Sequence, residues 1–297
     1  MLKQDYHIHS ELSPDSTASL DGICKQAFRL GLEEVALTDH YELIEGVTPR
    51  GSIRKEYLAL TREKILDCRS RWEGRIRVVF GIELGQIHRQ PEAAAQILAA
   101  NPYDFVLASL HRVEHTDLSL FNYQAIDGKA LRRTYGEELL EIAEKGDYDC
   151  LSHLDLIRRY PAFQGVTLRM EEDMEIVEEI LRQVIRRGKG IEINTTAGTL
   201  TEPLPSLEIL KTYRRLGGEI VTTGSDAHRA EDVAKGFANA EALLREAANM
   251  RAVMFIWHGP QERKRHLIDE RIGCLFLPLK GTWRDIRGRS CCGMAVP

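Results

Sequence analysis

The chain alternates between short, mostly apolar runs and longer amphipathic stretches. The apolar runs predict strands, and they lie at residues 5–9, 33–40, 75–85, 103–111, 148–154, 190–196 and 219–228. Apolar residues at helical spacing predict helices at 19–30, 54–72, 91–100, 129–146, 169–187, 205–218 and 230–247. Strands that alternate with helices in this way are typical of a parallel sheet.

Seven consecutive strand–helix units favour an α/β barrel over an open sheet. In such a barrel the active site lies at the carboxyl ends of the strands. An open, doubly wound parallel sheet is the alternative that the same pattern allows. We expect residues 1–256 to form the barrel, with one more strand at 251–257. Residues 257–297 show no clear period, and we interpret them as a C-terminal extension of uncertain structure.

The composition narrows the range of possible functions. The 297 residues carry a formal charge of −5, which is not the basic character typical of a nucleic-acid binder. No apolar run reaches the ~18 residues of a membrane span, and the first residues lack a signal-peptide core, so we expect a cytoplasmic protein. The six cysteines form no C-x-x-C pair, which disfavours a zinc ribbon or a disulfide framework.

Potential metal ligands gather where the predicted strands end. His7 and His9 are one residue apart in the first strand, so their side chains point to the same face. The other candidates end or follow later strands, or lie in the first strand–helix loop: Asp15, His40, Glu83, His111, His153, Asp226 and His228. Each alone has an ordinary explanation as a hydrogen-bonded loop residue or a helix cap. The set would converge at one end of a parallel barrel.

The chemistry of this set predicts a hydrolytic metal centre. Imidazole and carboxylate ligands without thiolate suit Zn, Mn or Fe. Nine candidates exceed the four ligands of one structural zinc, so we expect two or three divalent metal ions. A carboxylate, Glu83 or Asp226, would bridge two of them. Neighbouring metal ions activate water and stabilise both the attacking and the leaving oxygen in hydrolysis.

The motifs that hold these residues resemble those of the PHP (polymerase and histidinol phosphatase) superfamily. They run in the same order from residue 7 to residue 228: "HIHS", "TDH", "GIELG", "SLH", "SHLDLIRRY" and "TTGSDAH". The length, the insert at 41–72 and "HLDLIRRY" are most similar to monofunctional histidinol-phosphate phosphatases. The resemblance implies a distorted (β/α)7 TIM-like barrel with a trinuclear metal centre. It also implies hydrolysis of L-histidinol phosphate to L-histidinol and phosphate, a step of histidine biosynthesis.

The resemblance also assigns the ligands, motif by motif. It implies a first metal site made of His7, His9, Glu83 and Asp226. It implies a second site made of Glu83, His111 and His153, and a third made of Asp15, His40 and His228. Many members of the superfamily have histidine where this chain has Asp15. A carboxylate is a harder ligand and would change the metal preference of that site.

For the reaction we expect a metal-bound hydroxide to attack phosphorus. The residues that we expect to be catalytic are Asp226, Glu83 and His228. Arg158 or Arg159 would bind the phosphate through a guanidinium fork, although a solvated pair at a helix start explains them equally well. Asn194 and Glu114 are candidates for contacts to the imidazole and the amine. The insert at 41–72 would cover the site as a lid.

Three other functions remain open. The first alternative is a phosphatase of the same superfamily that acts on a nucleotide, a sugar phosphate or phosphotyrosine, because a fold does not fix a substrate. The second is a non-enzymatic metal-binding module. A metal-dependent amidohydrolase is the third alternative, but that class usually needs a carboxylated lysine or another histidine in mid-barrel, where this chain has Glu83. We expect a small phosphomonoester as the substrate and neither nucleic acid nor membrane as a partner; the oligomeric state is left open.

Overall fold

The computed structural model describes residues 2–43 and 51–247, followed by four separate strands between 254 and 285. The chain divides into two compact units, Met1–Arg251 and Ala252–Pro297. No helix of the described residues is long and apolar enough to cross a membrane.

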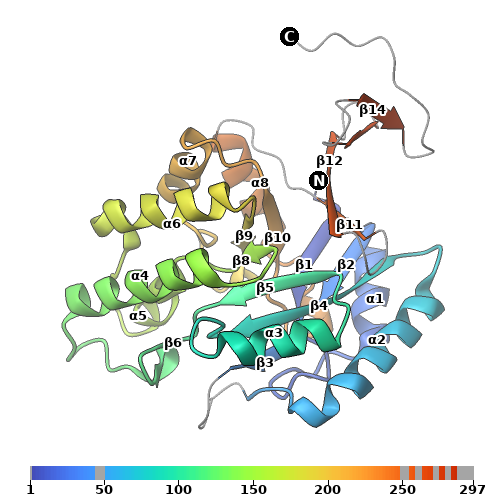
Figure 1. The fold of residues 1–297 in the computed structure, drawn as a ribbon, viewed down its shortest axis with the longest axis horizontal. Coiled ribbons are helices and arrows are strands. Elements are labelled where there is room, and N and C mark those ends of the chain that lie inside the picture. The colour runs from blue at the N-terminus through green and yellow to red at the C-terminus, as the bar shows by residue number, and fades with distance from the viewer. Residues whose placement is uncertain are drawn as a thin grey trace. The chain divides into compact units, whose positions relative to one another are not determined.

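The first unit is a nearly closed parallel barrel, as the sequence predicts (Figure 1). Its strands follow one another around the sheet in chain order: β1 (Gln4–Ile8), β2 (Glu34–Leu37), β4 (Arg77–Gly85), β5 (Phe105–Ser109), β8 (Cys150–Leu151), β9 (Gly190–Asn194) and β10 (Val221–Gly224). Every pair of neighbours in this series is parallel. A parallel bridge between Ile8 and Ala227 joins the first strand to the segment after the last one, which brings the sheet close to a closed ring.

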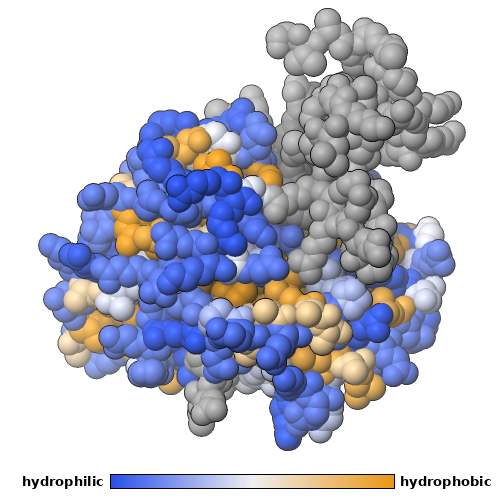
Figure 2. All heavy atoms as spheres, viewed as in Figure 1, coloured by the Kyte–Doolittle hydropathy of each residue, from blue (hydrophilic) through white to orange (hydrophobic). Residues whose placement is uncertain are grey.

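Helices connect the strands and bury one face each. They are α1 (Leu20–Arg29), α2 (Leu58–Trp72), α3 (Pro91–Ala100), α4 (Gly128–Lys145), α5 (Arg159–Phe163), α6 (Met174–Arg186), α7 (Leu207–Arg215) and α8 (Phe237–Glu246). In α6 the buried side chains Val177, Ile180, Leu181 and Val184 recur every three or four residues, which places them on one stripe. Figure 2 shows the complementary outer surface, where hydrophilic residues cover most of the visible face of this unit.

The structure differs from the predicted elements in the last strand–helix connection. The sequence predicts one helix at 230–247, but a short 3₁₀ turn (Ala230–Asp232) comes first and α8 begins only at Phe237. Gly236 has φ of +83°, a left-handed backbone that interrupts a helix. The backbone N–H of Ala234 donates to the carboxylate of Asp5 at 2.9 Å instead of to a helical carbonyl.

Three short strands were not expected from the sequence. β3 (His40–Glu42) runs parallel beside β4, and β6 (Arg112–Val113) and β7 (Thr116–Asp117) form a hairpin. The predicted lid at 41–72 is described only in part, because residues 44–50 lie outside the described residues and 58–72 form α2. The strand expected at 251–257 is described as β11 (Met254–Trp257), and residues 251–253 lie outside the described part.

The second unit contains an antiparallel sheet in the region where the sequence shows no clear period. Its strands are β11, β12 (Arg263–Asp269), β13 (Cys274–Leu277) and β14 (Thr282–Asp285), and they pair in that order.

Asp5 stabilises the contact between β1 and the segment after β10, which we call the closing seam of the barrel. Its side chain is fully buried in β1, and its carboxylate accepts backbone N–H groups from Ser225 and Ala234, both at 2.9 Å. Burial raises the pKa of Asp5 to about 6, although these N–H donors favour the ionised form and partly oppose the rise. One carboxylate therefore joins the first strand to the segment that follows β10.

Asp5→Ala is expected to lower the free energy of unfolding by about 3 kcal/mol, because it leaves buried N–H groups without an acceptor. The measurement is urea unfolding followed by circular dichroism. Glu33→Ala is the matched control, since the Glu33 side chain is 64% exposed and its loss should change stability by no more than about 0.5 kcal/mol. Equal unfolding midpoints for the two variants would contradict the role given to Asp5.

Candidate metal centre

The structure brings all nine predicted ligands to one end of the barrel. His7 lies in β1 and His9 just after it, and Glu83 lies in the carboxyl half of β4. The others follow or flank the carboxyl ends of the strands: His40 at the start of β3, His111 after β5, His153 after β8, and Asp226 and His228 after β10. Asp15, in the loop after β1, reaches the same place, with Oδ2 at 3.4 Å from His40 Nε2.

The residues of the first implied metal site, here called the first group, bring four donor atoms close together. They are His7, His9, Glu83 and Asp226. His7 Nε2 lies 3.1 Å from His9 Nε2 and 3.4 Å from Glu83 Oε2. Asp226 Oδ1 lies 3.6 Å from His7 Nε2 and 3.3 Å from His9 Nε2. A tetrahedral zinc ion with bonds of about 2.1 Å needs donors about 3.4 Å apart. The separations of His7 Nε2 and His9 Nε2 from each other and from the two carboxylate oxygens, 3.1 to 3.6 Å, are close to that spacing.

Glu83 connects this group to a second one. Its Oε2 faces His7 and His9, while its Oε1 lies 3.1 Å from His111 Nε2 and 3.0 Å from His153 Nε2. The hydroxyl of Ser109 donates to Oε1 at 2.5 Å and fixes the carboxylate from the side of β5. The two oxygens of one carboxylate thus serve two groups of histidines.

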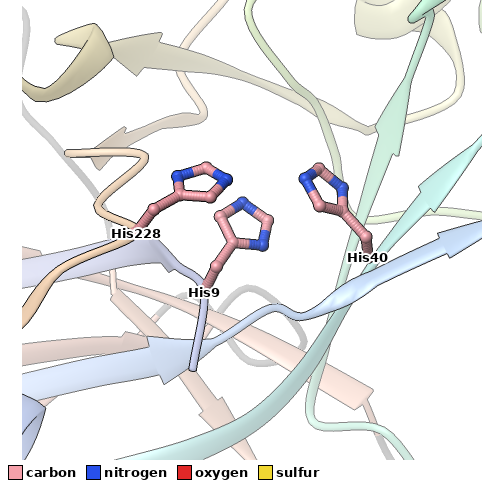
Figure 3. A group of neighbouring side chains, drawn as sticks. All are labelled: His9, His40 and His228. Atoms are coloured by element: carbon pink, nitrogen blue, oxygen red, sulfur yellow. The ribbon is translucent and has the colours of Figure 1, made fainter. Parts of the chain in front are cut away.

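A third group lies nearer to solvent. Asp15 Oδ2 faces His40 Nε2 at 3.4 Å and His228 Nε2 at 3.2 Å, and the His228 side chain is 30% exposed. Figure 3 shows His9, His40 and His228 gathered from three separate segments. The ring centroid of His9 lies 4.1 Å from that of His40 and 4.3 Å from that of His228, so His9 stands between the first and third groups.

Hydrogen bonds on the far side of the rings orient several of these histidines. Glu192 Oε1 lies 2.7 Å from His7 Nδ1, and Glu42 Oε1 lies 2.6 Å from His111 Nδ1. The backbone carbonyl of Asp226 lies 3.0 Å from His228 Nδ1. A histidine that binds a metal through one ring nitrogen usually donates its other N–H to such an acceptor. The arrangement therefore directs Nε2 of all three rings into the centre.

Sequence reasoning missed Glu42 and Glu192. Glu192 is fully buried in β9, and a lone acid inside the apolar run "GIEIN" was the available signal. Glu42 follows His40 by two residues in β3, a strand that was not expected. Asp39 was also missed: its carboxylate accepts the backbone N–H of Ser10 at 2.6 Å and the Ser10 hydroxyl at 2.9 Å, joining the first two loops of the site.

The charges of the buried groups suit cation binding. Burial opposes ionisation of Glu83, but nearby His40 and His7 outweigh it and hold the pKa of Glu83 well below its usual value. Burial likewise opposes the charge of Asp226, whose pKa is nevertheless held well below normal, chiefly by His7 and His9. Burial, reinforced by the charges of His40 and His228, lowers the pKa of His9. Ionised carboxylates and a neutral His9 are the states in which these ligands bind metals. Burial opposes the charge of His7 and His40, but the nearby carboxylates, chiefly Glu192 for His7 and Glu83 for His40, outweigh it and raise both pKa values, so a bound cation would have to displace those protons.

Several atoms at this place lack a protein partner. His9 Nδ1, His40 Nδ1 and Glu83 Oε2 are buried and have no hydrogen bond with the described residues. His40 Nδ1 and Glu83 Oε2 lie 2.6 Å apart and form an ion pair, so of the three atoms it is His9 Nδ1 that is left without a charged partner among the described residues. Buried polar atoms without partners are costly, and cations between them would satisfy them. The residues present therefore fit divalent metal ions.

A pocket of about 440 Å³ opens above the three groups. Arg159 lines it, with a guanidinium N–H donating to Asp226 Oδ2 at 3.2 Å. Beyond the predicted ligands and Arg159, the described lining residues are Ser119, Leu156, Tyr160, Arg229 and Asp232.

The other three predicted substrate contacts lie elsewhere. Arg158 is bound to Glu202 and to the carbonyl of Pro203 and does not line the pocket. Asn194 is fully buried behind His7, where its amide donates to Glu192 at 3.1 Å. Glu114 is exposed at the β6–β7 turn. The adjacent arginines diverge because one falls in a 3₁₀ turn (Leu156–Arg158) and the next begins α5.

Fold and site together define an α/β-barrel protein with a centre for divalent metal ions. The chain belongs to the PHP domain family, whose sequence profile matches residues 5–196. It is 30% identical to a histidinol-phosphatase of Lactococcus lactis over 83% of this chain and 92% of that protein. It is also 30% identical to a protein of Thermotoga maritima named "Probable histidinol-phosphatase", over 82% of this chain and 90% of that protein.

A solved structure extends the comparison. The crystal structure of the Lactococcus lactis histidinol phosphate phosphatase, in complex with zinc, L-histidinol and phosphate, superposes with a TM-score of 0.72. The two chains are 25% identical in this alignment, which covers 85% of this chain and 96% of the other. The barrel fold expected from the sequence is therefore confirmed.

Glu192→Gln is expected to weaken metal binding about 10- to 100-fold, because the His7 ring loses its charged acceptor. The measurement is the metal content that remains after dialysis against graded chelator concentrations. Glu208→Gln, the same change at an exposed position of α7, should retain wild-type metal content. A Glu192 variant that holds its metals as tightly as this control would contradict the orienting role.

Proposed function

We propose that this chain is a metal-dependent phosphomonoesterase that hydrolyses L-histidinol phosphate to L-histidinol and phosphate, a step of histidine biosynthesis. The observation that carries the proposal is the cluster of histidines and carboxylates around Glu83, whose two oxygens face five histidines beneath a pocket that also holds Arg159. The relatives named as histidinol-phosphatases support the same substrate.

In this proposal the nine residues hold two or three divalent ions, of zinc, manganese or iron. The first group is His7, His9, Glu83 and Asp226; the second is Glu83, His111 and His153; the third is Asp15, His40 and His228. Such ions, when bound, supply Lewis acidity that activates water and offsets the charge of the phosphoryl group.

The side chains of the protein have separate tasks. Glu83 and Asp226 provide the negative charge that balances the cations, and Glu83 keeps two groups at a fixed separation. Arg159 reaches the phosphate from the pocket wall: its Nε is buried without a hydrogen-bond partner among the described residues, so the fork has a donor to spare. His228, at the outer edge, completes the group nearest to the incoming substrate. The reaction consumes one water, breaks the P–O ester bond and leaves a proton on the alcohol.

Purified protein loaded with Zn or Mn is expected to release phosphate from L-histidinol phosphate far faster than from a nucleotide, a sugar phosphate or phosphotyrosine. A strong chelator should abolish the release. His9→Ala should lower kcat at least about 1000-fold, because it removes a ligand of the first group and the ring that packs against His40 and His228 of the third, while the protein stays folded by circular dichroism.

The other outcomes discriminate between functions. Release from a different ester alone would keep the metallophosphatase and refute the histidine-pathway substrate. No release from any ester, in protein shown to carry its metals, would favour the non-enzymatic metal-binding module. An unchanged rate after chelation, with the metals removed, would contradict metal dependence.

Arg159→Lys is expected to lower kcat/KM for the phosphoester about tenfold to a hundredfold, since an ammonium group cannot form the two-pronged contact to phosphate. Steady-state kinetics and metal analysis should show a rate loss without metal loss. The neighbouring Arg158→Lys is the matched control and should stay near wild type, because Arg158 contacts Glu202 and not the pocket. Wild-type kcat/KM in the Arg159 variant would exclude a phosphate clamp at that position.

A further inference from the structure

One acidic side chain of the pocket belongs to none of the three ligand groups. Four carboxylates line the pocket among the described residues: Asp15, Glu83, Asp226 and Asp232. The first three face histidines of the metal centre. Asp232 lies four residues beyond His228, at the end of the 3₁₀ turn that replaces the predicted start of the last helix.

The other three carboxylates have no oxygen left for a substrate cation. Asp15 accepts the Ser13 hydroxyl at 3.0 Å with its second oxygen. Glu83 divides its two oxygens between histidine groups, and Asp226 gives its second oxygen to Arg159. In a site that gathers divalent cations, these groups serve the metal centre.

Asp232 is placed differently. Its side chain is 18% exposed, and its partner among the described residues is Lys235, whose Nζ lies 2.8 Å from Oδ1. The Lys235 side chain is 55% exposed, so this ion pair lies largely in water and binds weakly. The second oxygen, Oδ2, forms no ion pair or hydrogen bond with the described residues and remains available to a cation that enters the pocket.

The charges around Asp232 leave its own charge effective. Arg229, the neighbouring cation of the pocket wall, is 65% exposed and so is itself largely screened by water, and its Nε donates to the carboxylate of Glu231 at 2.6 Å. The pocket lining also includes Leu156 and Tyr160, which offer apolar surface, and the neutral hydroxyl of Ser119. The wall above the metal centre thus combines one anionic spot with an apolar area.

We propose that Asp232 is a specificity-determining residue that binds the ammonium group of an amino-alcohol phosphate. The inference rests on the proposed function and deepens it. With the phosphate held at the base by the metal centre and Arg159, the ammonium on the adjacent carbon lies toward the wall, where it needs an anionic acceptor. A phosphomonoester without an ammonium group makes no use of this contact. Asp232 therefore selects for substrates that carry a positive charge close to the ester.

The test compares two substrates and two variants of the metal-loaded protein. The substrates are L-histidinol phosphate and its deaminated analogue, imidazolepropanol phosphate, which lacks only the ammonium group. The variants are Asp232→Asn and, as a matched control, Asp147→Asn. Asp147 also pairs with a lysine, Lys189 at 3.3 Å, and precedes β8, at the opposite end of the strands.

Asp232→Asn is expected to lower kcat/KM for L-histidinol phosphate about tenfold to a hundredfold, the range for a hydrogen bond to a charged group, chiefly by raising KM. The rate with the deaminated analogue should change less than about twofold, and Asp147→Asn should leave both unchanged. Calorimetry provides a readout without turnover: L-histidinol should bind the Asp232 variant more weakly by a similar factor.

Two results would overturn the inference. Equal losses with both substrates would mean that Asp232 acts on the metal centre or the phosphate and not on the ammonium. Wild-type kinetics with both would mean that it has no role. These results differ from failure of the proposed function, in which wild-type protein itself hydrolyses other esters but not L-histidinol phosphate.

Discussion

Glu83 is a fully buried carboxylate whose two oxygens face different histidines, and the rest of the site is arranged around it. An isolated buried carboxylate is strongly disfavoured, so Glu83 is ionised only because imidazoles surround it. Those imidazoles come from strands on both sides of β4. The barrel must therefore bring remote segments together for this carboxylate to remain charged.

The interdependence extends outward from that carboxylate. Glu192 orients His7 from β9 and also accepts the backbone N–H of His153 at 2.9 Å, so one side chain fixes members of two groups. Glu42, in β3, orients His111 in the same way. These acids are buried where a structural protein would place apolar residues. The site has thus replaced part of the barrel core with charged pairs, whose desolvation is offset only while every partner is present.

Much of this arrangement could be predicted because it follows from strand order. Parallel strands end at one edge, so His7, Glu83 and Asp226 had to converge once the strands were recognised. Contacts that depend on side-chain direction could not be predicted. Arg158 and Arg159 are neighbours in sequence, yet only the second faces the pocket, since a change from 3₁₀ to α geometry separates them. The position of Asp232 in the pocket could not be predicted for a similar reason. The helical periodicity of the sequence extends over 230–247, but the backbone at Gly236 interrupts this segment.

The closing seam of the barrel has a consequence for how the protein is made. Asp5 and Ser225, which it joins, are 220 residues apart, and the backbone N–H of Asp226 donates to the carbonyl of His7 across the same seam at 2.8 Å. At a synthesis rate of about 5–20 residues per second, a ribosome takes roughly 10 to 45 s to supply the second half of this contact. During that interval His7 and His9 already exist but Asp226 and His228 do not. In the proposed function, loading of the complete metal centre would therefore be a late event, which follows synthesis of the last strand of the barrel.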